Sequence, residues 1–511
     1  MKQRVLVASN RGPVSYQFGT DGSLAGRRGG GGMIAGVTSG LAAVAPDADV
    51  TWICAALSDA DRAAARQDGT GSRDEDGVPV RMLDIAPDTF DRAYNNVANS
   101  TLWFLHHLLF DTPVQPQFGQ EFGRDWAAYL AYNEAFAEAL AQEARTAAAP
   151  PGDIRVLIQD YHLSLAPRLL RDKLGGGADG TGIAHFHHTP WAPPDYYRLL
   201  PTGVGRTLLD GILGADHAGF HARRWAVAFL DCCEAILGAE VDRTAGRTAD
   251  GSGPVGRVRY RGHLTEVAVH PLGVDVPALR ARARAQDVRD HVGTLGRAAG
   301  GRKLIVRIDR TELSKNIVRG LAAYRELLAT RPQWHNRVVH LAFAYPSRSA
   351  LPEYRAYTDL VQRLAREICA EFGTADWTPL ILEVKDDYPR SLAACAVADV
   401  LLVNPVRDGM NLVAQEGPVL SEHGCALVLS REAGAAATLA ADALLVNPYD
   451  VGETADALHQ ALEMPEAERQ RRNAGLVSCA ADASPARWLG DQLAALGGSA
   501  GPAGTHSAPF G

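Results

Sequence analysis

An Asp-Gly pair at residues 408–409 stands where a sheet would present ligand-binding groups. The apolar run 397–403 predicts a buried parallel strand, so the polar residues 404–411 should lie at its carboxyl end. Ligands bind at that edge in open α/β sheets, and a helix beginning at Leu412 would offer unpaired N–H groups to a phosphate or a sugar hydroxyl. Glu416 lies one helical turn further on the same face, where a carboxylate can accept two hydrogen bonds from a ribose diol.

Two cations and a run of glycines are suited to the phosphates of such a ligand. Arg310 and Lys315 follow the predicted strand 304–308, and positive charge there would stabilise a departing diphosphate. Residues 29–32 are glycines between a predicted strand and a predicted helix, which lets the backbone approach a pyrophosphate closely. Their spacing is not the G-x-G-x-x-G of dinucleotide folds, and a glycine run alone is more often a linker.

A second group of polar and aromatic residues lies in the first half of the chain. Tyr94 and Trp103 belong to an aromatic, amide-rich segment of the kind that lines sugar sites, although such residues more often fill a core. Asp160 follows the predicted strand 154–158 and so falls at the carboxyl end of a first sheet. These residues predict a second candidate binding site at the carboxyl end of the first sheet.

Three histidines, at 185, 187 and 188, indicate a different chemistry, that of a metal site. On a strand, His185 and His187 share one face, and with Asp160 and His162 they would form a metal site. A metal-dependent hydrolase is therefore an alternative from another class. A non-catalytic sugar-phosphate sensor is a further alternative, but it would need only one of the two predicted pockets.

The string DGMNLVAQE at residues 408–416 resembles the donor-sugar loop of the trehalose-6-phosphate synthase family of retaining glycosyltransferases. Further motifs of that family occur in the expected order, among them S-N-R at 9–11, H-T-P at 188–190 and N-P-Y-D at 447–450. The resemblance extends from Arg11 to about Leu496. It implies an α/β fold of the GT-B type, in which two Rossmann-like domains with parallel sheets face each other across a cleft and a C-terminal helix crosses back to the first domain.

The resemblance also implies an activity and the residues that perform it. Glucose would pass with retention, by front-face attack and without a metal or other cofactor, from a nucleoside diphosphate to glucose 6-phosphate, giving α,α-trehalose 6-phosphate. The implied catalytic residues are His188, Arg310, Lys315 and Asp408. The implied donor contacts are Gly31, Gly32, Arg310, Lys315, Asp408, Gly409, Met410, Asn411, Leu412, Val413 and Glu416, and the implied acceptor contacts are Arg11, Tyr94, Trp103, Asp160 and Arg348.

Departures from the family pattern bear on both substrates. Trp52 is followed by Ile53-Cys54-Ala55 where the family has W-x-G-W, so a cyclitol phosphate acceptor is the enzymatic alternative. Thr311-Glu312 and Asn316 depart from R-L-D-x-S-K-G and are more similar to the pseudo-glycosyltransferase branch. The acidic stretch Lys385-Asp386-Asp387 stands at the base-binding loop and favours guanine over uracil, because a carboxylate accepts hydrogen bonds from guanine N1–H and N2–H₂. We therefore expect GDP- or UDP-glucose as donor.

Length and composition agree with two α/β domains. The chain has 511 residues, of which 46% are hydrophobic, enough for two cores. We predict an acceptor domain at 1–275, a nucleotide-sugar domain at 276–478 that opens with one helix over 278–300, a crossover helix at 479–496 and a disordered tail at 497–511.

Charge and cysteine content indicate where the protein works. A net charge of −8 gives no basic surface for nucleic acid or an anionic membrane, and neither is expected as a partner. The seven cysteines show no C-x-x-C spacing and predict reduced core residues. We expect a cytoplasmic homo-oligomer whose partners are its small-molecule substrates.

Overall fold

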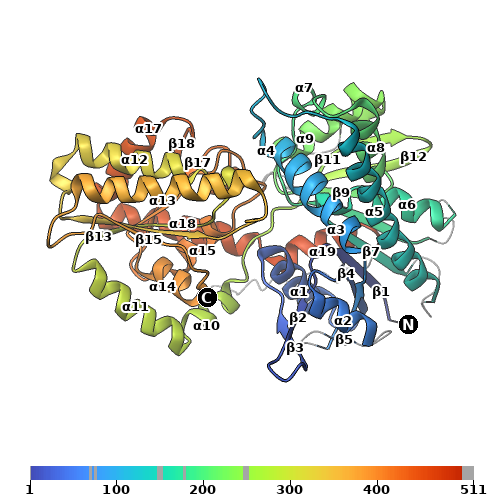
Figure 1. The fold of residues 1–511 in the computed structure, drawn as a ribbon, viewed down its shortest axis with the longest axis horizontal. Coiled ribbons are helices and arrows are strands. Elements are labelled where there is room, and N and C mark those ends of the chain that lie inside the picture. The colour runs from blue at the N-terminus through green and yellow to red at the C-terminus, as the bar shows by residue number, and fades with distance from the viewer. Residues whose placement is uncertain are drawn as a thin grey trace, which may run out of the picture.

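The computed structural model describes residues 2–67, 72–73, 77–146, 153–175, 180–244 and 253–497. Two sheets lie side by side in this part of the chain, each with helices on its faces (Figure 1). The predicted tail from residue 498 onward lies outside the described residues. No described helix is both long enough and apolar enough to cross a membrane.

The first sheet is built mainly from parallel strands. Ten of its strands lie in the described residues, and their order ends in antiparallel pairs at both edges. In spatial order they are β10 (Glu240–Asp242), β11 (Gly253–Tyr260), β12 (His263–Val269), β9 (His217–Phe220), β8 (Gly182–His187), β7 (Ile154–Gln159), β1 (Arg4–Ser9), β4 (Asp49–Ala55), β6 (Pro79–Leu83) and β5 (Ser72–Arg73).

Alternation along β1 explains why helices cover both faces of this sheet. Leu6 and Ala8 belong to a core with one set of helices, while Val5 and Val7 belong to a separate core on the opposite face. Successive strand residues point to opposite faces, so an uninterrupted apolar strand must be covered on both. The helices of the first core are α3 (Pro87–Asp91), η1 (Arg92–Leu102), α4 (Trp103–His107), α5 (Gln120–Thr146), η2 (Tyr161–Leu163), α6 (Ala166–Lys173), α7 (Pro194–Tyr197), α8 (Thr202–Ile212), α9 (Arg223–Cys232) and η3 (Cys233–Leu237).

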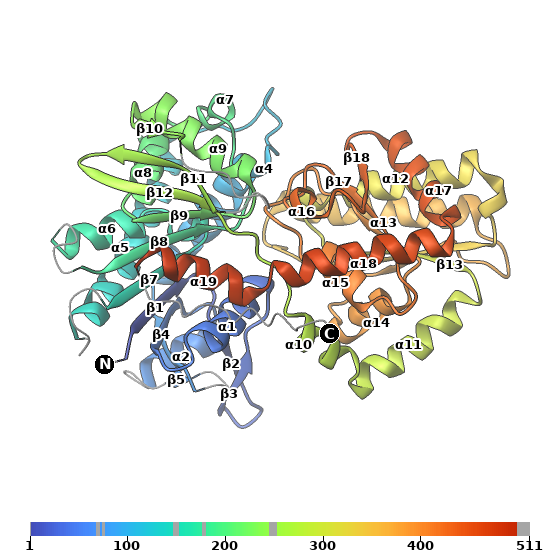
Figure 2. The ribbon, with the colours of Figure 1, turned by 180° about the vertical axis from the view of Figure 1, so that it is seen from behind.

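The opposite face of the first sheet is covered by helices from both ends of the chain. These are α1 (Gly32–Val44), with α2 (Asp59–Gln67) beside it, and α19 (Pro485–Ala495). Trp488, Leu489 and Leu493 of α19 are buried there, each contributing roughly 1.5–3 kcal/mol by burial. Figure 2 shows α18 (Glu466–Asp482) and α19 running in succession from the second sheet to the first. The hairpin β2 (Val14–Phe18) and β3 (Leu24–Arg28) precedes α1.

The second sheet is parallel throughout its described strands. Their spatial order is β15 (Leu380–Glu383), β14 (Val338–Tyr345), β13 (Lys303–Arg310), β16 (Val400–Val403), β17 (Ala426–Ser430) and β18 (Leu444–Val446). The order reverses between β13 and β16, which is the kind of switch point where α/β sheets bind ligands. The surrounding helices are α10 (Val276–Ala283), α11 (Gln286–Ala299), η4 (Leu313–Lys315), α12 (Ile317–Thr330), η5 (Pro332–Trp334), α13 (Pro352–Phe372), α14 (Tyr388–Val397), α15 (Val413–Leu420), α16 (Ala436–Leu439) and α17 (Val451–Glu463).

Several predicted element boundaries are wrong. The crossover helix predicted at 479–496 is divided, since α18 ends at Asp482 and α19 begins at Pro485. The single helix predicted over 278–300 is two helices, α10 and α11, because Ala285 adopts an extended conformation between them. The strand predicted at 397–403 begins only at Val400, since Val397 ends α14. The helix predicted to begin at Leu412 begins at Val413. The predicted domain limits stay predictions, although each sheet lies on its expected side of residue 276.

Candidate active site between the two sheets

The loop between β16 and α15 carries a buried ion pair. Lys315 Nζ lies 2.6 Å from Asp408 Oδ2, and the Asn411 side chain donates to the same oxygen at 3.2 Å. Burial alone would raise the pKa of Asp408, but the Lys315 ammonium outweighs it, so the pKa is lowered and the carboxyl is ionised. Lys315 comes from η4 after β13, so the pair joins the loops of two neighbouring strands.

The Asp-Gly turn presses against the first domain. A Cβ on Gly409 would lie 1.8 Å from the carbonyl oxygen of His188, so only glycine permits this approach. Trp225 Nε1 donates to the Gly409 carbonyl at 3.1 Å, and an Arg407 N–H donates to the Trp191 carbonyl at 2.8 Å. The turn predicted to bind a ligand is therefore also an inter-domain contact.

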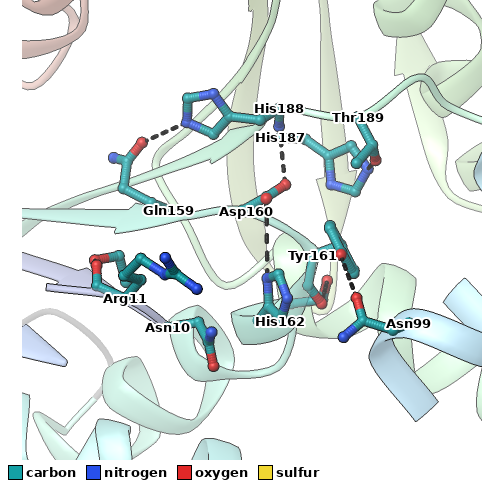
Figure 3. Close-up of polar contacts among 12 residues, drawn as sticks. Asn10, Arg11, Asn99, Gln159, Asp160, Tyr161, His162, His187, His188 and Thr189 are labelled. Carbon is teal, nitrogen blue, oxygen red and sulfur yellow. Dashed lines mark hydrogen bonds and ion pairs between the residues drawn. The ribbon is translucent and has the colours of Figure 1, made fainter. Parts of the chain in front are cut away.

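His188 is held as a neutral imidazole beside this turn. Its Nε2 lies 2.9 Å from Gln159 Oε1, and its backbone N–H donates to Asp160 (Figure 3). Its Nδ1 lies 3.2 Å from His221 Nε2. Burial and the neighbouring His221 lower the pKa of His188 well below the usual value. An uncharged imidazole carries no charge to attract a phosphate, and to bind a sugar hydroxyl His188 would have to exchange one of these two hydrogen bonds.

The histidine cluster is not arranged as a metal site. The ring centroids of His185 and His187 are 6.1 Å apart, and His187 Nε2 is hydrogen-bonded to Thr189. Across the described ranges, no group of three or more His, Cys, Asp or Glu residues is placed to hold a metal ion. The cluster therefore provides no ligand set for the hydrolase alternative.

The predicted acceptor residues gather at the carboxyl end of β7. Asp160 adopts a positive φ of 73° there, and burial raises the pKa of its carboxyl to about 7. The Arg11 side chain extends towards Asp160 and His162, and its charge contributes to lowering the pKa of His162, after burial and Arg348 (Figure 3). Tyr94 stacks on His162 with ring centroids 5.6 Å apart.

Arg348 reaches this group from the second domain. Its guanidinium carbon lies 4.1 Å from the Trp103 ring centroid, and its N–H groups donate to Tyr354 at 2.7 Å and to Tyr161 at 3.3 Å. Burial alone would lower the pKa of the Arg348 guanidinium, but the nearby Glu312 carboxylate outweighs it. The pKa is raised overall and the guanidinium stays protonated. Arg348 is a fixed cation on the acceptor side, stacked on an aromatic face from the first domain.

The remaining donor residues line the same edge. Gly32 meets Leu412, whose Cδ1 would lie 2.3 Å from an added Cβ, so the glycine loop and the donor loop touch across the domains. Gly31 has a φ of 118°, which favours glycine. Arg310 is half-exposed and paired with Glu312 at 2.9 Å, and burial raises the pKa of Glu416 to about 7. Met410 is buried, and Val413 is half-buried in α15.

Four residues that take part in this geometry were not predicted: Glu312, Trp225, His221 and Gln159 as a partner of His188. Glu312 stands next to a predicted cation, and its position two residues after Arg310 was a usable signal. Trp225 and His221 come from a segment with no motif in the sequence, so only the fold reveals them.

The match to known proteins extends across these two domains. The family model described as "Glycosyltransferase family 20" matches residues 3–497. The chain belongs to glycosyltransferase family 20. The predicted resemblance to trehalose-6-phosphate synthases is thereby confirmed.

Individual members of this family agree over nearly the whole chain. The alpha,alpha-trehalose-phosphate synthase [UDP-forming] of Schizosaccharomyces pombe is 32% identical over 92% of this chain and 85% of its own length. A solved alpha,alpha-trehalose-phosphate synthase from Burkholderia xenovorans, in complex with glucose-6-phosphate, superposes with a TM-score of 0.80 at 26% identity, covering 97% of this chain and 100% of that one. A structure from E. coli, bound with UDP-2-fluoro glucose, gives 0.79 at 27% identity over 96% and 98%. The expected GT-B fold, including the helix that returns to the first domain, is confirmed.

Proposed function

We propose that this family 20 glycosyltransferase is an α,α-trehalose-6-phosphate synthase that transfers glucose, with retention, from a nucleoside diphosphate to glucose 6-phosphate. The contact between the Gly409 turn and the His188 carbonyl carries this proposal. It brings the Lys315–Asp408 pair of one domain next to the His188–Asp160 pair of the other. A sugar bound there would have donor groups on one side and acceptor groups on the other.

The charges on the two sides match the two substrates. Arg310 and Lys315 would stabilise the negative charge that grows on the departing diphosphate. Arg348 and Arg11 would bind the acceptor phosphate, while Trp103 and Tyr94 would cover the sugar ring. His188 and Asp408 would hold hydroxyls of the transferring glucose.

The carboxylates argue for front-face attack within this proposal. Asp408 is committed to Lys315 and Asn411, and Asp160 accepts the His188 backbone N–H. A covalent intermediate needs a carboxylate against the anomeric carbon, whereas the proposal assigns Asp408 to a sugar hydroxyl and Asp160 to the acceptor. The departing diphosphate would itself take the proton of the attacking hydroxyl, so the scheme requires no metal.

The loop after β15 would contact the base of the donor. Lys385 and Asp386 are exposed after β15, whereas Asp387 accepts the Arg390 N–H and begins α14. Asp386 is thus the carboxylate available to guanine, while the named relatives are UDP-forming. We expect GDP- or UDP-glucose to serve as donor.

One assay tests the whole proposal. Purified protein with EDTA and glucose 6-phosphate receives UDP-, GDP- and ADP-glucose in separate reactions, and nucleoside diphosphate release and product mass are followed. Trehalose 6-phosphate from one donor is the expected result. Diphosphate release without that disaccharide would point to another acceptor, such as a cyclitol phosphate, and activity that appears only with added zinc would favour the hydrolase.

Light scattering on the same sample tests the predicted homo-oligomer.

A further inference from the structure

A buried carboxylate lies between the two proposed phosphate-binding arginines. Glu312 directly follows the end of β13, two residues after Arg310, and its side chain is 0% exposed. Its backbone is fixed on both sides, because its N–H donates to the Arg310 carbonyl and its own carbonyl accepts the Lys315 N–H. Burying a carboxylate is costly unless it is paired, so the surroundings of this one must compensate for its charge.

The compensation comes from the two arginines together. Glu312 Oε1 lies 2.9 Å from an Arg310 nitrogen and 3.7 Å from an Arg348 nitrogen, and the Ser347 hydroxyl donates to it at 2.8 Å. Burial would raise the pKa of Glu312, but Arg310 and Arg348 lower it to about 2. The carboxylate is therefore ionised throughout the physiological range.

The two arginines differ in exposure and are assigned to different substrates. Arg310 is 54% exposed at the donor side, whereas the Arg348 side chain is 9% exposed and stacks on Trp103 of the acceptor side. Two guanidinium groups so close together would repel each other without an anion between them. Glu312 lies behind both and is shielded from solvent, so it acts on the substrates only through the arginines.

We propose that Glu312 is a positioning residue that couples the two substrates by holding Arg310 for the donor diphosphate and Arg348 for the acceptor phosphate. This inference rests on the proposed function. Loss of the carboxylate would loosen both guanidinium groups at once, so binding of each substrate would suffer. Loss of either arginine would remove the contacts to one substrate only.

A purely electrostatic role of Glu312 and a positioning role predict opposite effects on substrate binding when the carboxylate is removed. Glu312→Gln removes a negative charge next to two bound anions, so a purely electrostatic role would tighten the binding of both substrates. A positioning role predicts that KM for the nucleotide sugar and KM for glucose 6-phosphate both rise about fivefold or more, with kcat about tenfold lower. Glu312→Asp keeps the charge and is expected to restore part of kcat.

The experiment combines kinetics with binding that needs no turnover. Wild type, Glu312→Gln, Glu312→Asp and the control Glu371→Gln are titrated calorimetrically with UDP or GDP, with glucose 6-phosphate, and with each in the presence of the other. Glu371 is a suitable control because it forms an exposed pair with Arg325 at 2.7 Å near the end of α13 and belongs to none of the predicted motifs. We expect each ligand to strengthen the other in wild type and in the control, and this coupling to be lost in Glu312→Gln.

The outcomes separate this inference from the proposed function. If the wild type binds both ligands but makes no trehalose 6-phosphate, the proposed function fails while the titrations still decide the coupling. Unchanged coupling in Glu312→Gln, weaker binding of only one ligand, or tighter binding of both would overturn the positioning role. If Glu312→Gln does not fold, the same comparison between wild type and Glu312→Asp is expected to show partial loss of coupling, and full coupling there would overturn the role.

Discussion

The Lys315–Asp408 pair concentrates the chemistry of the proposed donor site in two side chains. Both are mostly buried, with 14% and 16% of their side chains exposed. A buried pair contributes little net stability, but removal of one partner leaves the other charge uncompensated. In the proposed function, the pair would fix a cation next to the donor diphosphate.

Replacement of Lys315 by alanine should abolish most of the activity. The leaving diphosphate loses a cation, and the Asp408 carboxylate is left buried with its pKa raised. We expect kcat/KM for the nucleotide sugar to fall about 100-fold or more. The exposed Lys2→Ala, before the amino-terminal end of β1, serves as a control and should stay within about threefold of wild type, since surface cations contribute little. Activity of Lys315→Ala within threefold of wild type would refute the role of this cation.

Asp160 should make stability depend on pH. Its pKa rises from 3.8 to about 7 on folding, chiefly through burial, with Arg348 and Arg310 opposing the shift. The folded state therefore binds more protons than the unfolded state between those two values, and the free energy of unfolding contributed by this group falls as pH rises through them.

The variant Asp160→Asn cannot ionise and should lose that dependence. Asparagine also tolerates the positive φ of 73° at this position. We compare the free energy of unfolding of the variant with that of wild type at each pH. This difference should be about 1–3 kcal/mol more in favour of the variant at pH 8 than at pH 5, since one pKa unit corresponds to about 1.4 kcal/mol. Urea unfolding at both pH values measures this difference. An equal difference at pH 5 and pH 8 would mean that Asp160 ionises normally.

At the scale of elements, Asn316 joins three loops of the second sheet. It has a φ of 58° between η4 and α12, and its side-chain N–H groups donate to the Asn404 carbonyl at 2.9 Å and to the Pro448 carbonyl at 2.7 Å. These carbonyls follow β16 and β18, so the residue fixes the loops that carry Lys315 and Asp408. The family's glycine at this position would satisfy φ but not the two acceptors.

Two substitutions of Asn316 separate the contribution of its two hydrogen bonds from that of its left-handed backbone conformation. Asn316→Gly loses both hydrogen bonds, whereas Asn316→Ala also places a Cβ in the left-handed region, which costs about 1 kcal/mol more. We expect melting temperatures in the order wild type, then Gly, then Ala. Thermal denaturation followed by circular dichroism gives the order, and an Ala variant as stable as the Gly variant would show that the backbone at this position rearranges.

The elements also show what the sequence could predict. Apolar runs such as 400–403 and 426–429 lie in buried strands because uninterrupted apolar residues fit a sheet covered on both faces. The break between α10 and α11 carries no glycine or proline, so the helical pattern across Ala285 hid it. Arg310 and Asp408 were identified from motifs, but Trp225 acts through a contact with Gly409 that is distant in sequence, which no local pattern encodes.

At the scale of the whole molecule, the two domains meet through the donor loop. Arg224 pairs with Glu432 at 3.0 Å across the interface, and the Trp225 ring lies between the guanidinium groups of Arg224 and Arg407, 4.0 and 4.4 Å away. Trp225 also donates to the Gly409 carbonyl. The same loop therefore serves as the proposed sugar site and as the contact that registers one domain on the other, so closure of the domains and assembly of the site are one event.

Gly409→Ala should prevent that event without unfolding either domain. The added Cβ would stand 1.8 Å from the His188 carbonyl oxygen, and because this atom is backbone the domains must separate to accommodate it. A shift of about 1 Å at the reacting groups costs about 100-fold in rate, so we expect kcat/KM to fall by at least that factor. Small-angle X-ray scattering with both substrates should show a larger radius of gyration than wild type, while the melting temperature changes little.

Gly296→Ala in α11 is the matched control, since a Cβ there meets nothing within 4 Å and alanine favours a helix. Wild-type activity in Gly409→Ala would mean that catalysis proceeds without this contact, and the proposed site would then have to be assembled in another way.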